Sequence, residues 1–517
     1  MSDPAASESL TRGTVLPGGE RLDKERDGCD TVVIGSGAAG AVIAAELAEA
    51  GQDVVVLEEG PHVPPERYSA MRPSQTMRHM WRDAGLTFAI GLGDTPMINV
   101  MMGRCFGGSS VLTGGVCFRV PGSVLHEWRE RFGLADFTEA NMLPCAEAVE
   151  RTLNVQTVPV EMRSKSTRLF LEGAEKLGIP SKPLRRNTRD CDGCGRCNFG
   201  CPHGRKLSVD VTYLPRALAA GARVYTDCKV ERITSHAGRA SGVRARFMSP
   251  GRAKALGSLE VRAKRVVLAA GAYASPVLLM NSGFRSAEVG KNLTLHPGFR
   301  VMARFDEPVR GWQGALQSAY SDALEDDRIT LVGLFVPPGV LAATLPGIGP
   351  EHARRAASIP YLSVFGGMLH DAAGGRVHRR FGQPFMTYRL GPADHAAVPK
   401  LMRTMAEIYF AAGAREVFLP VLGLGGIDAD ALRSLDLAAI PKRMLECSSQ
   451  HPLGTCRMGT SPETSVVDPD GQAWELPGLY IADGSIVPTS LGVNPQLSIM
   501  TLAMRIAWKL REQPFLS

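Results

Sequence analysis

Residues 30–60 read DTVVIGSGAAGAVIAAELAEAGQDVVVLEEG, and this stretch decides the fold of the N-terminal part of the chain. The β-branched run 31–34 predicts a buried strand, and 53–57 predicts a second one. The alanine-rich residues between them predict a helix that Gly51 can end. The order strand, helix, strand is a βαβ unit, which predicts a doubly covered α/β sheet.

Three glycines at the turn into this helix predict a nucleotide site. Gly35, Gly37 and Gly40 form the pattern G-x-G-x-x-G. The first allows a tight turn, the second lets the backbone approach a pyrophosphate, and the third lets helix and strand pack closely. Glu58, directly after the second strand, can accept the ribose hydroxyls. The pattern alone does not separate NAD from FAD.

Length and composition describe a globular protein of two domains. The chain has 517 residues, of which 21% are charged, and a formal net charge of +6. A small basic group, Arg185, Arg186 and Arg189, lacks interleaved aromatic residues, so we interpret it as a solvated face and expect no nucleic-acid partner. The longest apolar stretch, 266–280, is interrupted by Gly271 and Pro276, and we expect no membrane span.

The first 28 residues are polar and rich in proline, glycine and charge. They contain no apolar core flanked by basic residues, so we predict a flexible leader over 1–28 and no secretory signal. This composition favours a cytoplasmic protein.

Four of the eleven cysteines fall within eleven residues. Cys191, Cys194, Cys197 and Cys201 have the spacing C-x2-C-x2-C-x3-C-P, which is typical of the iron-sulfur runs of bacterial ferredoxins. We favour a [4Fe-4S] cluster over structural zinc, because zinc ligands usually come as two separated pairs. A cysteine loop without metal is the third alternative. The last ligand of such a cluster is either Cys201 or one of the remote thiols Cys105, Cys117 and Cys228.

Segment 103–110, GRCFGGSS, suits neither a regular strand nor a helix. Paired glycines followed by hydroxyls suit a backbone that passes tightly against a ligand and offers donors to it. The candidate contact residues are Arg104, Gly108, Ser109 and Ser110. A plain turn accounts for the same composition.

The rest of the chain alternates between two kinds of pattern. Residues 121–190 are mainly helical, 223–271 returns to strands, and 301–440 mixes alternating strands with a helix near 395–412. Residues 447–510 then return to the first domain. We predict a nucleotide-binding domain from 29–120, 206–300 and 441–517, and a substrate domain from 121–205 and 301–440 that contains the cysteine loop 191–201.

Five segments together resemble the glucose-methanol-choline (GMC) oxidoreductase family. They are GSGAAG with Glu58, GRCFGGSS at 103–110, VVLAAGAYASPVLLMNSG at 266–283, HPLGTCRMG at 451–459 and LYIADGSIVPTSLGVNP at 479–495. The resemblance implies an α/β Rossmann-like FAD-binding domain plus an α+β substrate domain with an antiparallel sheet, the two-domain architecture shared with p-hydroxybenzoate hydroxylase.

The resemblance also implies FAD as the cofactor. Some members anchor FAD through a histidine after the paired glycines, but Leu112 stands there, so we expect noncovalent FAD. Thr113 stands where the family commonly has asparagine, which leaves that flavin contact open. The implied cofactor-binding residues are Gly35, Gly37, Ala38, Ala39, Gly40, Glu58, Arg104, Gly108, Ser109, Ser110, Val230, Ala270, Gly271, Asp483 and Gly484.

Two residues match the catalytic positions of the family. His451 is the expected general base, since a histidine pKa lies near working pH, and Asn494 is expected to hold the substrate oxygen in place. His296 also matches a family segment, where we expect a structural role.

The resemblance predicts oxidation of a primary or secondary alcohol, a small molecule that is sugar-like, aminoglycoside-like or sterol-like. Hydride passes to flavin, and electrons leave to an external acceptor or to O2. A cluster in the cysteine loop favours a dehydrogenase over an oxygen-consuming oxidase. The remaining alternative is an NAD(P)-dependent dehydrogenase, which the late motifs disfavour.

Overall fold

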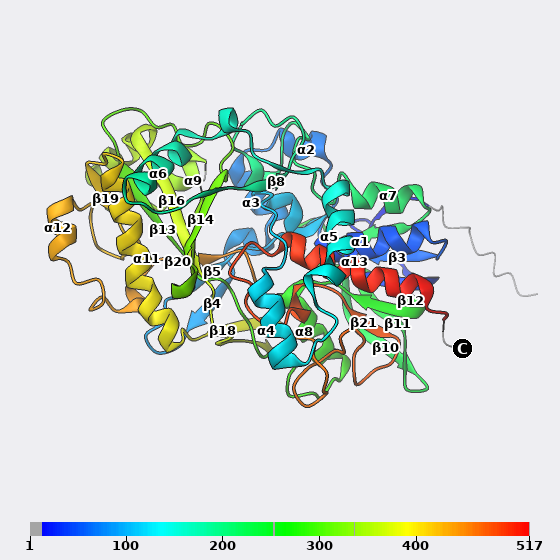
Figure 1. Cartoon of the computed structure of the whole chain (residues 1–517). Coiled ribbons are helices and arrows are strands. Elements are labelled where there is room, and N and C mark those ends of the chain that lie inside the picture. The colour runs from blue at the N-terminus through cyan, green and yellow to red at the C-terminus, as the bar shows by residue number, and fades with distance from the viewer. Residues whose placement is uncertain (1–12, 252–253, 335–336, 516–517) are drawn as a thin grey trace, which may run out of the picture.

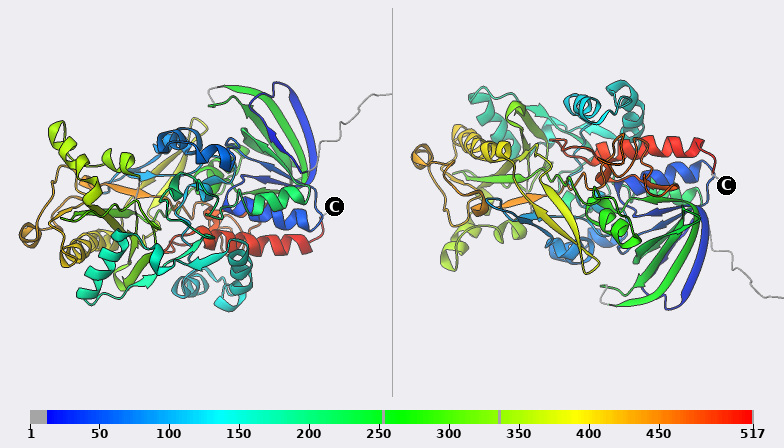
Figure 2. Two further views of the ribbon diagram at one scale, coloured as in Figure 1. Left: turned by 90° about the horizontal axis from the view of Figure 1, so that it is seen from above. Right: turned by 90° about the horizontal axis from the view of Figure 1, so that it is seen from below.

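The computed structural model describes residues 13–251, 254–334 and 337–515. Two β-sheets occupy the two ends of an elongated molecule, each with its own helices (Figure 1). Views from above and below show the same two lobes, with chain segments crossing between them (Figure 2). The C-terminal helix α13 lies beside the N-terminal helix α1 in one lobe.

The first sheet is built around the βαβ unit. Strand β2 pairs in parallel with β3 on one side and with β12 on the other. The last four residues of β2 and all four of β3 are buried, as expected for parallel strands covered on both faces. The strands of this sheet are β1 (Val15–Pro17), β2 (Lys24–Ile34), β3 (Val54–Leu57), β9 (Arg223–Thr226), β10 (Cys228–His236), β11 (Arg239–Met248), β12 (Ala255–Leu268) and β21 (Leu479–Ile481).

Helix packing joins distant segments onto this sheet. Helix α1 (Ala38–Glu49) contacts α7 (Tyr213–Ala219) and α13 (Gln496–Glu512), and α13 contacts α5 (Glu139–Thr152). Nine of the twelve residues of α1 are buried, because its small alanines allow close approach from several sides. This packing fixes the N-terminus of α1 at the carboxyl ends of β2 and β3.

The second sheet is mixed and mainly antiparallel, with β13 pairing β16, β19 and β20. Helices α6 (Lys165–Lys176) and α11 (Pro392–Ala411) cover one face, and Phe170 of α6 stacks on Phe365 of β16 at 3.8 Å between ring centroids. Its strands are β4 (Phe88–Gly91), β5 (Ile98–Val100), β7 (Lys182–Pro183), β13 (Gly298–Arg304), β14 (Ala319–Leu324), β15 (Ile329–Gly333), β16 (Leu362–Leu369), β17 (Gly375–Arg380), β18 (Gln383–Tyr388), β19 (Glu416–Phe418) and β20 (Cys447–Ser449).

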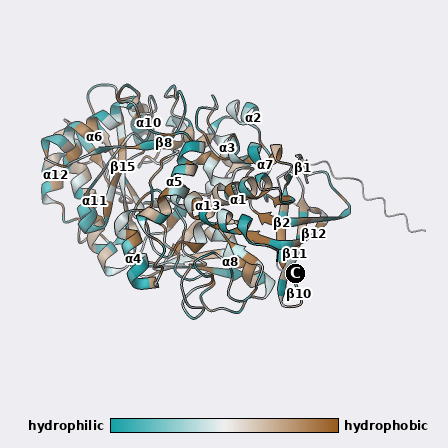
Figure 3. Ribbon diagram, turned by 45° about the vertical axis from the view of Figure 1, so that its right-hand side comes forward, coloured by the Kyte–Doolittle hydropathy of each residue, from teal (hydrophilic) through white to brown (hydrophobic). Residues whose placement is uncertain are grey.

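The outer helices carry polar residues on their exposed sides, whereas the strands combine apolar and polar stretches, with β3 and the end of β2 apolar (Figure 3). A third, two-stranded sheet pairs β6 (Val155–Thr157) with β8 (Arg185–Asn187). In the described ranges, no helix is both long enough and apolar enough to cross a membrane. The remaining α-helices are α2 (Pro65–Ser69), α3 (Pro73–Met80), α4 (Gly122–Phe132), α8 (Gly271–Ser282), α9 (Pro338–Ala342), α10 (Pro350–Ala357) and α12 (Ala429–Ser434).

The predicted fold class is confirmed: an α/β domain with parallel central strands sits beside a domain with a mainly antiparallel sheet. The predicted leader over 1–28 is wrong where the structure describes it, because β1 pairs with β9 and β2 begins at Lys24. Residues 1–12 lie outside the described residues. The structure also places β4 and β5, at 88–100, in the second sheet, where the predicted domain division has them in the first domain.

Candidate active site

A first cavity of 250 Å³ opens at the carboxyl ends of β2, β3 and β12, beside the start of α1. Fourteen of the fifteen residues predicted to bind the cofactor line it: Gly35, Gly37, Ala38, Ala39, Glu58, Arg104, Gly108, Ser109, Ser110, Val230, Ala270, Gly271, Asp483 and Gly484. The exception is Gly40, which faces the strand instead: a Cβ atom there would lie 1.9 Å from the carbonyl oxygen of Gly35. Gly40 thus serves the close packing of helix on strand.

Two glycines form a backbone cradle in this cavity. Gly108 has φ +55°, and a Cβ atom added to it would lie 2.8 Å from Cα of Gly37. The two backbones therefore pack directly against each other, with no room for a side chain at Gly108. A bare backbone with donors at a helix N-terminus fits the pyrophosphate of a dinucleotide.

Two buried carboxylates hold the loops around the cradle. Glu58 Oε2 accepts hydrogen bonds from the backbone N–H of Ser36 (3.0 Å) and from its hydroxyl (2.7 Å). Asp483 Oδ2 accepts from the N–H of Gly271 (2.7 Å) and from the hydroxyl of Ser275 (2.6 Å). The bonds of Asp483 join segments that are more than two hundred residues apart in the sequence. The motif at 479–495 therefore holds the loop at 271–275 in place beside the cavity.

A second, larger cavity of 520 Å³ meets the first at His451, Ser109 and Ser110. Asn494 lines the second cavity, so the predicted catalytic pair stands at the junction. Most of the wall is apolar, and it comes from both lobes: Met77, Trp81, Leu86, Met101, Phe199, Phe299, Leu316, Val332, Leu334, Val340, Met368 and Ile499. Thr113 lies here too, and its hydroxyl donates to Gln496 Oε1 at 2.9 Å.

The side chains of His451, Asn494 and His296 form one chain of contacts. His451 Nε2 lies 3.2 Å from the Asn494 side-chain nitrogen, and His451 Nδ1 lies 3.3 Å from His296 Nδ1. Burial, and then His296, hold the pKa of His451 well below its usual range. His451 is therefore a neutral imidazole at ordinary pH.

His296 was expected to be structural, and its surroundings are unusual for a purely structural residue. Its φ is +48°, a region that residues other than glycine seldom occupy. Asp371 Oδ1 accepts its backbone N–H at 3.0 Å, and burial lowers the pKa of its imidazole to about 3. Strain of this kind persists where the surroundings impose it, often at functional sites. No local pattern in the sequence signals it, because the contacts come from residues far along the chain.

The cysteine loop lies next to this site. The 3₁₀ turn at Cys197–Phe199 contacts the turn at Gly108–Leu112, and Phe199 lines the second cavity. Cys201 Sγ accepts hydrogen bonds from the backbone N–H groups of Arg205 (3.2 Å) and Lys206 (3.4 Å). The interpretation of 185–189 as a solvated face is wrong for Arg186, which is 1% exposed and donates to Cys197 Sγ at 2.9 Å.

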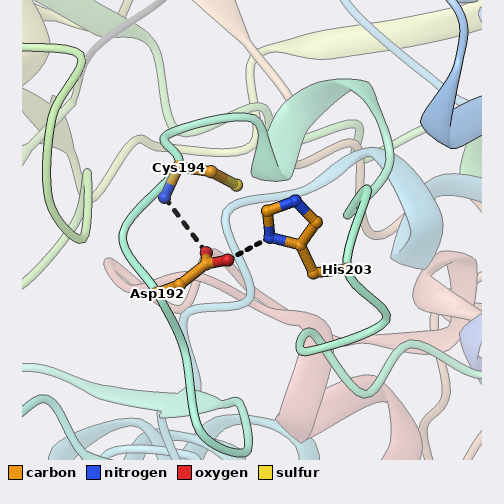
Figure 4. Close-up of side chains that lie close together, drawn as sticks. All are labelled: Asp192, Cys194 and His203. Carbon is orange, nitrogen blue, oxygen red and sulfur yellow. Dashed lines mark hydrogen bonds and ion pairs between the residues drawn. The ribbon is translucent and has the colours of Figure 1, made fainter.

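One triad of metal-binding side chains sits at the exposed rim of the same loop (Figure 4). Asp192, Cys194 and His203 form the single set of three or more such ligand atoms within 4.8 Å of one another in the described part of the chain. A tetrahedral zinc ion with bonds of about 2.3 Å to sulfur brings four thiolates to within about 4 Å of one another. The four cysteines of the loop do not have that arrangement.

Comparisons with known proteins agree on one family. Two family models described as GMC oxidoreductase match residues 29–298 and 375–503. An uncharacterized GMC-type oxidoreductase of Mycobacterium tuberculosis is 38% identical over 92% of this chain and 75% of its own length. The long-chain-alcohol oxidase FAO1 of Arabidopsis thaliana is 28% identical over 95% of this chain and 68% of its own.

Solved structures support the fold. A formate oxidase of Aspergillus oryzae, in a study of FAD modification, superposes with a TM-score of 0.73 at 16% identity, covering 94% of this chain and 99% of that one. The two family models together span most of the chain, so the comparisons show a flavin-dependent oxidoreductase. The chain belongs to the GMC oxidoreductase family and is an FAD-dependent enzyme that acts on CH–OH groups.

Proposed function

We propose that this enzyme oxidises a primary or secondary alcohol carried on an apolar body. The observation that carries this proposal is the 520 Å³ cavity, whose largely apolar wall meets the flavin cavity at His451 and also includes Asn494. An apolar wall gains free energy by burying hydrocarbon and gains little from a polyhydroxylated sugar. The relative named long-chain-alcohol oxidase supports the same substrate class. Of the three classes considered from the sequence, this favours sterol-like substrates and adds long-chain alcohols.

In this mechanism His451 takes the hydroxyl proton and Asn494 holds the substrate oxygen. FAD, when bound by the residues of the first cavity, supplies the acceptor for the α-hydrogen and its electron pair. The alcohol carbon is thereby oxidised to a carbonyl carbon, and the proton lost from oxygen resides on the imidazole. The neutral imidazole of His451 can accept a proton, but burial holds its pKa below the range that favours a base, and the apolar cavity excludes competing water. Residues 29–120, 206–300 and 441–517 supply nearly all of the flavin side, and they share the wall of the substrate side with 121–205 and 301–440.

A chain-length series tests the substrate class. Anaerobic reduction of the bound flavin is followed spectroscopically with linear primary alcohols, a sterol and a sugar alcohol. We expect kcat/KM to rise by roughly fourfold per methylene, since each buried CH2 contributes about 0.8 kcal/mol, until the cavity is full. Val332→Phe places a larger side chain in the wall of the cavity. It should therefore lower kcat/KM only for the longer substrates. A preference for the sugar alcohol would overturn the assignment.

We also propose that Cys191, Cys194, Cys197 and Cys201 hold an iron-sulfur cluster, with [4Fe-4S] as the expected type. The support is the ferredoxin-like spacing of the four cysteines, a loop that contacts the turn at Gly108–Leu112, and N–H groups that donate to Cys201 Sγ. When bound, such a cluster supplies one-electron transfer. This favours an external electron acceptor over O2.

Iron and acid-labile sulfide analysis of the purified protein tests this second proposal. We expect iron and sulfide together with flavin, and slow turnover with O2 relative to a one-electron dye. A protein with flavin bands alone and fast O2 consumption is a simple oxidase. The four cysteines of the loop are free thiols, which supports the cytoplasm as the location. Cell fractionation tests that point.

A further inference from the structure

Two buried cations lie beside the cysteine loop. They lack the carboxylate partners that their neighbours in the sequence have. Arg186 is 1% exposed and Lys206 is 2% exposed. Neither forms an ion pair with a carboxylate of the described residues. Their neighbours do: Arg185 pairs with Glu150 at 2.8 Å, and Arg205 approaches Asp190 at 3.6 Å.

Arg186 faces the loop from strand β8. Its Nη2 donates to Cys197 Sγ at 2.9 Å, and its Nε donates to the carbonyl oxygen of Gly114 at 2.8 Å. The guanidinium therefore contacts one sulfur and one neutral carbonyl oxygen. These contacts balance its positive charge only if the sulfur is negatively charged.

Lys206 faces the same loop from the other end. Its ammonium donates to three carbonyl oxygens, those of Val111 (2.7 Å), Thr113 (2.8 Å) and Cys197 (2.9 Å). All three donors are used, so the hydrogen bonds are satisfied, but each acceptor is neutral. The contacts link Cys197 to the segment that separates the two cavities.

No ion pair with a carboxylate of the described residues balances these two charges directly. Burying an uncompensated cation costs several kcal/mol, and two stand within reach of one sulfur loop. Asp210 lies near enough to interact with Lys206, but its carboxylate oxygens accept hydrogen bonds from the hydroxyls of Ser208 (2.6 Å) and Tyr68 (3.2 Å) and form no ion pair with the ammonium. Four thiolates around a doubly charged iron-sulfur core leave a net charge of minus two, which would match the two cations.

We propose that Arg186 and Lys206 are the fixed counter-cations of an anionic iron-sulfur centre in the cysteine loop, and that they tie this centre to segment 111–114 beside the flavin site. They act as positioning residues and set the potential of the centre, because each positive charge favours the state with one more electron. This inference rests on the proposed iron-sulfur cluster.

The test compares variants that remove the charge of Arg186 or Lys206 with variants that remove the charge of the adjacent residue. Arg186→Met and Lys206→Met are measured beside Arg185→Met and Arg205→Met, and Arg186→Lys and Lys206→Arg keep the charge. The readouts are iron and sulfide per chain, the rate of iron loss to a chelator, and the midpoint potential from a redox titration followed by visible and EPR spectra. All are independent of turnover.

We expect both charge-removing variants to have a more negative midpoint potential and to lose iron about tenfold faster, which corresponds to about 1.4 kcal/mol. The neighbouring variants and the charge-keeping variants should stay close to the parent protein. If Arg186→Met does not fold, Lys206→Met and Lys206→Arg make the comparison. Folded variants with the parent's potential and iron retention would overturn the counter-cation role and leave two structural cations. A parent protein without iron and sulfide overturns the cluster itself, and this inference with it.

Discussion

His296 Nδ1 lies 3.3 Å from His451 Nδ1, and this contact fixes which nitrogen of His451 carries its hydrogen. His296 Nε2 accepts the backbone N–H groups of Leu491 (3.0 Å) and Gly492 (3.3 Å), so the hydrogen of neutral His296 is on Nδ1 and is donated to His451. His451 then carries its own hydrogen on Nε2. Turning the Asn494 amide over gives this hydrogen to Oδ1, a buried oxygen that otherwise has no partner.

The resting tautomer of His451 therefore presents a donor at the atom where a general base needs a lone pair. Its hydrogen has to move to Nδ1 before Nε2 can take the hydroxyl proton, and that requires His296 to turn its own donor away. A donor aimed at Nδ1 also stabilises the neutral imidazole, in agreement with the depressed pKa of His451. His296 thus controls which nitrogen of His451 carries the hydrogen, and it lowers the pKa of His451.

Two substitutions at His296 separate this control from simple support of the fold. Glutamine can place an acceptor near the position of Nε2 but removes the donor to His451, whereas asparagine can keep a donor near Nδ1 and loses the acceptor for Leu491 and Gly492. We expect His296→Gln to move the low-pH limb of kcat/KM to higher pH, because the pKa of His451 rises. His296→Asn should keep the limb and lose about 1–3 kcal/mol of stability. Loss of stability in both variants with no shift of the limb in either would assign His296 to the fold alone.

Removal of the imidazole of His451 tests its place in the chemistry. We expect His451→Ala to lower turnover by roughly 10²–10⁴-fold, the usual contribution of a positioned acid or base. Flavin content should stay the same, since the residues that line most of the first cavity are unchanged. His126→Ala, on helix α4 and outside both cavities, is the matched control. Turnover equal to the parent's would remove His451 from the reaction.

The early motif and the late motifs could be predicted from the sequence because each is local. The βαβ unit needs only strand and helix periodicity and three glycines, and the helix beginning at Gln496 shows its apolar face directly. The same local reasoning fails where a neighbour decides the outcome. Arg186 reads as a surface cation in its charged run, yet β8 turns it toward Cys197.

Residues that join the two lobes were the hardest to predict. Phe199 and Val332 line one cavity although they come from a cysteine loop and a strand of the second sheet, and nothing in their local sequence distinguishes them from core residues. His296 lies in a segment that resembles the family, but nothing in the sequence indicates its contact with His451. Long-range pairing and backbone strain leave no periodic trace in a sequence.

Gly108 provides a direct test of the cofactor cradle. We expect Gly108→Ala to abolish or severely weaken FAD binding, because the new methyl group would lie 2.8 Å from Cα of Gly37 and would push the glycine-rich turn that approaches the pyrophosphate out of position. Gly51→Ala is the control, since Gly51 also has a positive φ but no atom within 4 Å of an added Cβ. Both variants should lose about 1–2 kcal/mol of stability from backbone strain. FAD affinity, measured by fluorescence of released flavin, should fall only in Gly108→Ala. Equal affinities in the two variants would contradict the cradle.

Cys197→Ser decides which metal, if any, the cysteine loop holds. Cys197 is the sulfur that Arg186 contacts, so we expect this variant to lose iron and sulfide while it keeps flavin. Cys456→Ser, at a buried thiol far from the loop in sequence, should keep all three. A different result identifies the exposed triad instead: if the protein contains zinc that survives in Cys197→Ser and is lost in His203→Ala, the ion sits with Asp192 and Cys194 and the iron-sulfur proposal is wrong. Elemental analysis of the four proteins therefore separates the two sites, because each relies on a side chain that the other does not use.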